Sequence, residues 1–231
     1  MPTSGPTRLR PSGRRVLRHL VLAATAAMAG STVVVLLDSH DGTFLLSMAT
    51  AYASLLLLGA TLVIGPSNVV RGRSNPVSTH LRRDLGIWAG LLALLHMGVG
   101  LQVHLRGSME RYFVSPPGRG VIPLRYDAFG VVNWLGLIGA GIIIVLLAIS
   151  NDRSLVRLGT GRWKRIQRWS YGLFVLVLVH GVGYQLIEGR PAGWVGAVTA
   201  VGAVAAAIQL VGYRAARSRS RGNHSRRGGQ G

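Results

Sequence analysis

The sequence predicts an all-α, polytopic membrane protein, a bundle of six transmembrane helices with both termini in the cytoplasm. Hydrophobic residues make up 49% of its 231 residues, whereas charged residues make up only 14%. The charges lie between six apolar runs that contain no Asp, Glu, Lys or Arg, at residues 20–37, 43–64, 85–105, 128–149, 170–187 and 191–213. About 20 helical residues span the hydrocarbon core of a bilayer, which matches the length of each run.

The basic residues set the predicted orientation. Of the 26 Lys and Arg residues, 21 lie on one side of a chain that crosses the membrane six times. The other side carries five Arg and five of the seven acidic residues. This asymmetry follows the positive-inside rule with cytoplasmic termini. The net charge of +19 therefore reflects topology, and no nucleic-acid binding is expected, because no aromatic residues alternate with the charges of the tail.

The predicted organisation is a basic arm, a membrane domain and a basic tail. Residues 1–18 and 214–231 are expected to be disordered, and residues 19–213 to form the six-helix domain. The pair Arg14-Arg15 before the first run resembles an export signal, but that run is longer than the apolar part of a signal, which favours a retained helix. The second helix is expected to end at Gly65-Pro66.

Two histidines fall in the middle of apolar runs. His96 lies 12 residues beyond Asp84, and His180 lies 11 residues beyond Trp169. Both imidazoles are therefore expected about 16–18 Å into the membrane, on helices that run in the same direction. An imidazole at that depth is costly unless its nitrogens are engaged. Two facing imidazoles can ligate haem iron axially, and a polar pair of a transporter is the alternative that these residues leave open.

The other histidines are expected to have no cofactor role. His104 lies about 12 Å further along the helix than His96, at the outer boundary, so the two cannot share one iron. His40 and His80 fall in loops. The chain has no cysteine, which excludes disulfides, iron–sulfur clusters and covalently attached haem.

Small and basic residues near the histidine pair could complete a haem site. Glycines beside the two histidines would leave room for a macrocycle, namely Gly98, Gly100, Gly181 and Gly183. Arginines at the inner ends of the same helices are candidates for pairing with the haem propionates, namely Arg82, Arg83, Arg165 and Arg168. For any single one of these arginines, the positive-inside rule is the better explanation.

Two blocks of the sequence resemble the ferric reductase-like transmembrane domain family. RRDLGIWAGLLALLH (82–96) is similar to the family's Arg-Arg-x-Leu-Gly-x-x-Ala run ending in Leu-His. RLGTGRWKRIQRWSYGLFVLVLVH (157–180) is similar to its Arg-x-Leu-Gly-x-x-Trp-x-x-Leu-His-Arg-x-x-Tyr run, which a second His follows. The likeness is nearest to the haem-b membrane subunits of bacterial methionine sulfoxide reductase systems. It implies one haem b, held by His96 and His180, because Gln167 stands where the family has a further histidine.

The resemblance implies an electron-transfer (oxidoreductase) subunit in the plasma (inner) membrane. Electrons would pass from a separate flavoreductase or a membrane quinol, through the haem, to an outer-face acceptor such as ferric iron or a periplasmic oxidoreductase. No flavin or nicotinamide site is expected in the chain, because no GxGxxG fingerprint occurs between a strand and a helix. The alternative is a haem-free transporter or scaffold that kept the six-helix fold without the cofactor.

Overall fold

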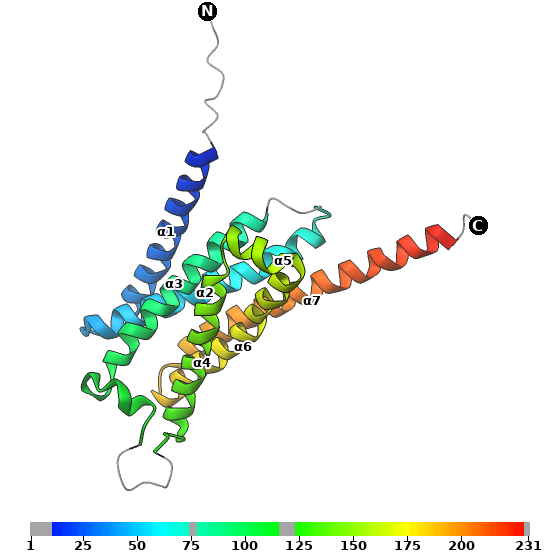
Figure 1. The fold of residues 1–231 in the computed structure, drawn as a ribbon. Helices are drawn as coiled ribbons and strands as arrows, with labels where there is room; N and C mark the ends of the chain where they lie inside the picture. The colour runs from blue at the N-terminus through cyan, green and yellow to red at the C-terminus, as the bar shows by residue number, and fades with distance from the viewer. Residues whose placement is uncertain (1–10, 74–77, 116–122, 229–231) are drawn as a thin grey trace, which may run out of the picture.

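The computed structural model describes residues 11–73, 78–115 and 123–228, and these are mainly helical (Figure 1). In chain order the α-helices are α1 (Pro11–Leu36), α2 (Gly42–Val70), α3 (Ser78–Val103), α4 (Ala128–Ala148), α5 (Asp152–Gln167), α6 (Trp169–Ile187) and α7 (Ala192–Gly228). Two short 3-10 helices, η1 (Leu105–Gly107) and η2 (Met109–Tyr112), follow α3. Within the described ranges the only β-pairing is an isolated bridge between Val114 and Leu124.

Six helical segments are long and apolar enough to cross a membrane. They correspond to the six apolar runs, with α1, α2, α3, α4, α6 and α7 as the spanning helices. The prediction of an all-α, multi-pass membrane protein is therefore confirmed, while the orientation of the termini stays a prediction. Helix α7 continues to Gly228, so most of the basic tail is helical in this structure. The first ten residues of the basic arm lie outside the described residues.

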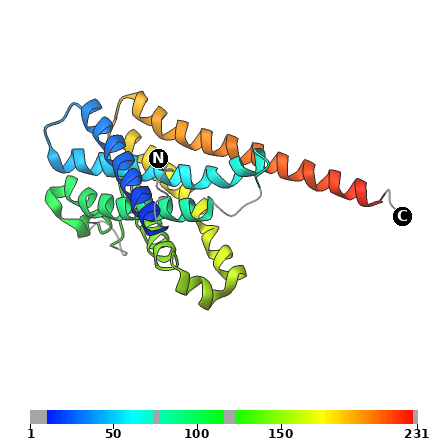
Figure 2. The ribbon, with the colours of Figure 1, turned by 90° about the horizontal axis from the view of Figure 1, so that it is seen from above.

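Helix α2 is the central helix of the bundle. It packs against α1, α3, α6 and α7 and carries the longest series of buried residues. Figure 2 shows α7 lying alongside α2 and running beyond the rest of the bundle. The backbones of α3 and α6, which carry His96 and His180, do not approach each other closely in the described part of the chain. Contacts through α2 on one side and α4 on the other connect them instead.

Helix α2 does not end at Gly65-Pro66, as the sequence suggested, but continues through Pro66 to Val70. A proline inside a helix has no N–H, so the carbonyl four residues earlier loses its donor. That carbonyl belongs to Leu62, and the side-chain amide of Gln209 on α7 donates to it at 2.8 Å. Gly212 lets α7 approach, because a Cβ there would lie 2.5 Å from Cβ of Pro66. Helix α7 thus donates the hydrogen bond to Leu62 that the proline cannot donate.

A buried acid ties α1 to α3. Asp84 is 1% exposed and forms an ion pair with Arg18, and His19 Nε2 lies 3.9 Å from its second oxygen. The indole of Trp88 donates to Nδ1 of His19 at 3.2 Å. The sequence had suggested that His19 was only part of the basic flank. The structure makes it a contact between two spanning helices.

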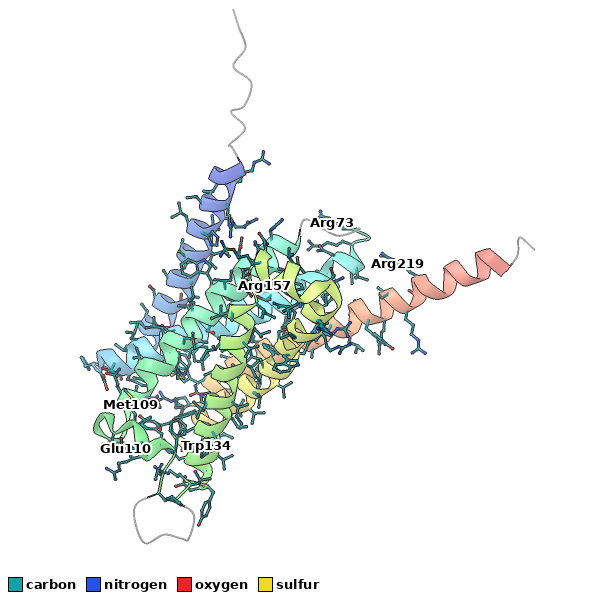
Figure 3. The ribbon with its side chains drawn as sticks, in the orientation of Figure 1. Arg73, Met109, Glu110, Trp134, Arg157 and Arg219 are labelled. Atoms are coloured by element: carbon teal, nitrogen blue, oxygen red, sulfur yellow. The ribbon has the colours of Figure 1, made fainter. Side chains whose placement is uncertain are left out.

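Helix α5 is a basic helix between two spanning helices, and the sequence did not predict it. Asn151 caps its start by accepting from the N–H of Ser154, and the left-handed backbone of Gly159 (φ 68°) breaks it midway. It lies at the end of the bundle where Figure 3 labels Arg73, Arg157 and Arg219, whereas Met109 and Glu110 lie at the other end. We call these the basic end and the loop end.

Candidate functional site

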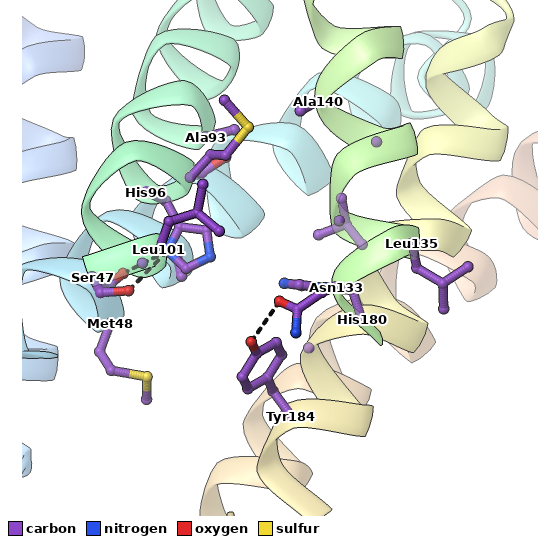
Figure 4. A pocket seen from close by; sticks show the side chains of 18 of the residues that line it. Ser47, Met48, Ala93, His96, Leu101, Asn133, Leu135, Ala140, His180 and Tyr184 are labelled. Atoms are coloured by element: carbon purple, nitrogen blue, oxygen red, sulfur yellow. Dashed lines mark hydrogen bonds between the residues drawn. The ribbon is translucent and has the colours of Figure 1, made fainter. Parts of the chain in front are cut away.

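The imidazoles of His96 on α3 and His180 on α6 face each other across a pocket between α2, α3, α4 and α6 (Figure 4). Their ring centroids are 6.3 Å apart, and the ring planes are nearly perpendicular, at 76°. The structure thus brings together two residues that are 84 positions apart in the chain. We call this space the histidine pocket.

Backbone carbonyls hold the Nδ1 atom of both rings. Nδ1 of His96 lies 3.0 Å from the carbonyl oxygen of Ser47 and 3.2 Å from its hydroxyl. Nδ1 of His180 lies 2.8 Å from the carbonyl oxygen of Val132. A carbonyl oxygen only accepts, so each Nδ1 carries the proton and each Nε2 presents a lone pair. Neither Nε2 has a hydrogen-bond partner among the described residues.

The spacing of the two rings suits a metal ion between them. Metal–imidazole bonds of about 2 Å, with roughly 1 Å more from each nitrogen to its ring centre, place two opposed imidazoles about 6 Å apart. Second-shell hydrogen bonds from Nδ1 to a carbonyl are the usual means of orienting such ligands. Among the described residues no group of three or more His, Cys, Asp or Glu lies close enough to hold a metal ion. The two histidines therefore fit a metal whose remaining ligands come from a macrocycle.

Glycines make room for both rings. A Cβ at Gly136 on α4 would lie 2.8 Å from Cε1 of His180, closer than real Cβ atoms come. A Cβ at Gly100 would lie 3.3 Å from the hydroxyl of Ser47 and 3.6 Å from Cε1 of His96. Gly183 allows α6 to approach Val132, which it would meet at 2.7 Å. Gly98 and Gly181 leave only open space or ordinary contacts.

Polar groups extend from the histidine pocket towards the loop end. Tyr184 lies next to His180, with ring centroids 5.1 Å apart, and donates to Asn133 at 2.7 Å (Figure 4). The ring of His104 stacks on Tyr184 at 6.3 Å, and its Nε2 lies 3.3 Å from Glu188. His104 therefore has partners inside the protein, which the sequence did not predict.

Tyr112 and Arg190 complete the loop end of the histidine pocket. Tyr112 is 1% exposed, and its hydroxyl accepts from the N–H of His104 at 2.8 Å, which fixes the end of α3. Burial raises the pKa of Tyr112, so it stays a neutral phenol at neutral pH. The guanidinium of Arg190 lies 4.4 Å above the ring of Phe44 and 3.6 Å from Glu188. Arg190 is the one cationic side chain among the described residues that line this pocket.

The arginines that the sequence suggested as propionate partners line a different pocket, nearer the basic end. Arg82, Arg83 and Arg168 lie there together with Gln167. Arg83 precedes His96 by 13 residues and Arg168 precedes His180 by 12, which is about 18–20 Å along the helices. No histidine lies among the described residues that line this second pocket. The structure therefore does not bring these arginines to the histidine pair.

Comparison with known proteins finds relatives among curated bacterial proteins. The chain is similar to haem-binding subunits of bacterial methionine sulfoxide reductases. It is 28% identical over 131 residues to the protein-methionine-sulfoxide reductase heme-binding subunit MsrQ of Xanthomonas campestris pv. campestris (strain 8004). The match to MsrQ of Xanthomonas axonopodis pv. citri (strain 306) is 27% over the same length. Each match covers 57% of this chain and 54% of the relative, so the chain spans about half the length of the curated relatives it matches.

No family model matches the chain. The likeness to MsrQ is the expected one, because the two blocks around His96 and His180 resemble the ferric reductase-like transmembrane family to which haem-binding subunits of this kind are assigned. What the sequence missed are the groups that hold the histidines. Ser47 and Val132 act through their carbonyls, which carry no side-chain signal.

Proposed function

We propose that this chain is a haem-b membrane subunit that transfers electrons across the bilayer for a separate reductase. The observation that carries the proposal is the pair of imidazoles of His96 and His180. Their ring centroids are 6.3 Å apart, both Nδ1 atoms are hydrogen-bonded to carbonyls, and the lone pair of each Nε2 is therefore available to bind a metal ion. The similarity to MsrQ, whose name states that it binds haem, supports it independently.

The residues present fit a haem. His96 and His180 would be its axial ligands, and the four equatorial positions would belong to the porphyrin. Haem bound in this way supplies one-electron oxidation and reduction with no open iron position. The protein residues orient both imidazoles and surround them with apolar side chains such as Ala93, Ala140 and Val177, which keep water away. We propose one haem only, because Gln167 and the second pocket offer no histidine.

Arg190 is our candidate for the propionates. It lines the histidine pocket at the loop end, and Phe44 and Glu188 hold its guanidinium in place. Arginine pairs with carboxylates through two parallel hydrogen bonds, which suits a propionate. Arg82, Arg83 and Arg168, which the sequence had suggested for this role, line the second pocket, and their contact with propionates stays a prediction.

The direction of transfer follows from the charge of the two ends. Cytoplasmic termini would place the basic end inside and the loop end outside, in the plasma (inner) membrane. A flavoreductase or a membrane quinol would then deliver electrons, and an outer acceptor such as ferric iron or a periplasmic oxidoreductase would receive them. Neither partner is part of this chain in the proposal, which assigns it no flavin or nicotinamide site.

The test is the visible spectrum of the purified protein in detergent, oxidised and after reduction with dithionite. We expect a b-type spectrum at about one haem per chain, absent from His96→Ala and from His180→Ala. His104→Ala, a histidine at the same pocket that is not a proposed ligand, is the control and should keep the spectrum. A wild type that stays colourless after haem supplementation would exclude the proposal and favour the haem-free transporter or scaffold.

A further inference from the structure

The second pocket has a cationic rim and an apolar interior. It lies between α2, α3, α4, α5 and α6, has a volume of about 390 Å³, and adjoins the histidine pocket, with which it shares Ser54, Ile143 and Val177 as lining residues. Four basic side chains line it, namely Arg82, Arg83, Lys164 and Arg168. Its other walls are apolar and largely buried, among them Leu58, Ala89, Ile143 and Leu173. We call it the basic pocket.

The positive charge of the basic pocket is poorly neutralised. Arg83 donates to Asp152 at the start of α5. In the part of the chain that the structure describes, no carboxylate lies within ion-pair distance of Arg82, Lys164 or Arg168. The described lining residues include no Asp or Glu. Three cations gathered around one cavity favour an anionic occupant.

Two buried donors in the basic pocket also lack partners. The hydroxyl of Ser170 belongs to a residue that is only 6% exposed, and it makes no hydrogen bond. The Nε of Arg83 is likewise buried and unpaired. Buried polar groups without partners are rare and costly, and each calls for an explanation. An occupant with several acceptor oxygens would satisfy both.

We propose that the basic pocket binds an anionic phospholipid. Its phosphate would take the rim formed by Arg82, Lys164 and Arg168 and accept from Ser170, while part of an acyl chain would fill the apolar interior. Basic pockets between transmembrane helices on the cytoplasmic side suit such headgroups. Trp163 and Tyr171 line the same pocket, and these are residue types that favour the membrane–water interface.

The amphiphilic lining distinguishes this lipid from other occupants. Inorganic phosphate would satisfy the rim but leave the apolar interior unfilled. A neutral phospholipid would fill the interior but leave three cations without a counter-charge. The proposal rests on Arg82, Lys164, Arg168 and Ser170, none of which lines the histidine pocket. Its test therefore does not depend on haem binding by His96 and His180.

The test compares lipid binding by the full-length protein in neutral detergent. Native mass spectrometry counts the bound lipids, and thermal unfolding reports stabilisation, with phosphatidylglycerol, phosphatidylcholine or inorganic phosphate added. We expect one retained phosphatidylglycerol per chain and a higher Tm with this lipid only. The triple variant Arg82→Gln/Lys164→Gln/Arg168→Gln should bind it about a hundredfold more weakly, since each basic residue near an anionic headgroup contributes roughly fivefold.

The triple variant Arg214→Gln/Arg217→Gln/Arg219→Gln on α7 is the matched control. It removes the same charge away from the pocket and should bind phosphatidylglycerol like the wild type. Ser170→Ala provides a second variant that keeps every charge. Without lipid its Tm should equal or exceed that of the wild type, because an unpaired buried hydroxyl is lost, whereas the gain from phosphatidylglycerol should be smaller.

Three results would overturn the proposal. Equal stabilisation by phosphatidylcholine, or none by any lipid, would exclude an anionic lipid site. Equal stabilisation by inorganic phosphate would identify a site for a soluble phosphate compound instead. Equal weakening in both triple variants would show that the lipid responds only to the overall charge of the protein.

Discussion

Gly136 on α4 lies directly against the imidazole of His180 on α6. A Cβ at this position would be 2.8 Å from Cε1 and 3.0 Å from Nδ1 of the ring. The ring has little freedom to move away, because its Nδ1 is hydrogen-bonded to the carbonyl of Val132, which lies one turn before Gly136 on α4. The ring of His180 can therefore occupy its position only because Gly136 has no side chain.

We expect Gly136→Ala to lose haem while keeping the fold. The added methyl group would displace the ring of His180, and changes around metal ligands lower metal affinity by about 10–100-fold. Haem content per chain after purification is the measurement. Gly141→Ala is the control, because a Cβ there would have nothing within 4 Å and the helix gains the same propensity. Equal haem content in the two variants would contradict this role of Gly136.

Ser47→Ala should weaken haem binding less than His96→Ala does. The variant removes the hydroxyl 3.2 Å from Nδ1 of His96 but keeps the carbonyl at 3.0 Å. Losing one hydrogen bond of about 1 kcal/mol should speed haem loss about fivefold. The rate of haem transfer to an excess of a haem-scavenging apoprotein measures this. Ser54→Ala, which loses a hydrogen bond to Ala89 on the same pair of helices, should leave the rate unchanged.

Removing Arg18 and removing Asp84 from their ion pair should reduce the stability of the protein by different amounts. Arg18→Gln leaves a carboxylate that is 1% exposed without its counter-charge, and such losses cost about 3 kcal/mol or more. Asp84→Asn leaves an arginine whose side chain is 32% exposed and can reach water, so we expect a smaller cost. Unfolding in detergent measures both variants. The double variant should be more stable than Arg18→Gln alone, and a double variant that is less stable would contradict this account.

Gln209→Leu should destabilise the bundle by about 1–3 kcal/mol, because it leaves the buried carbonyl of Leu62 without a donor. The same substitution should cost less in a Pro66→Ala background. Alanine at position 66 restores the backbone N–H that normally serves this carbonyl. Thermal unfolding of the four proteins in the cycle is the measurement. An equal cost in both backgrounds would show that Gln209 does not compensate for the proline.

The six spans and the histidine pair could be predicted because both depend on properties that the sequence carries locally. Apolar length identifies a spanning helix, and the rise per residue gives the depth of His96 and His180. The end of α2 could not be predicted in this way. Pro66 is a sound stop signal on its own, and the group that overrides it, Gln209, lies more than 140 residues further along the chain.

The surroundings of the site were less predictable for a similar reason. The hydrogen bonds that Nδ1 of His96 and of His180 donate to the carbonyls of Ser47 and Val132 depend on which helices become neighbours, and no side-chain pattern in the sequence marks these backbone groups. Asp84 looked like the boundary of a span rather than the partner of Arg18 on another helix.

In the described part of the chain the backbones of α3 and α6 do not approach each other closely, which bears on the order in which the protein assembles. Because only α2 and α4 connect the helices that carry the two histidines, α1 to α4 can enter the membrane before the second ligand has left the ribosome. In the proposed function, haem would be bound by both histidines only once α6 is in place. If the proposed haem is absent, only the contacts through α2 and α4 would hold α3 and α6 in place relative to each other.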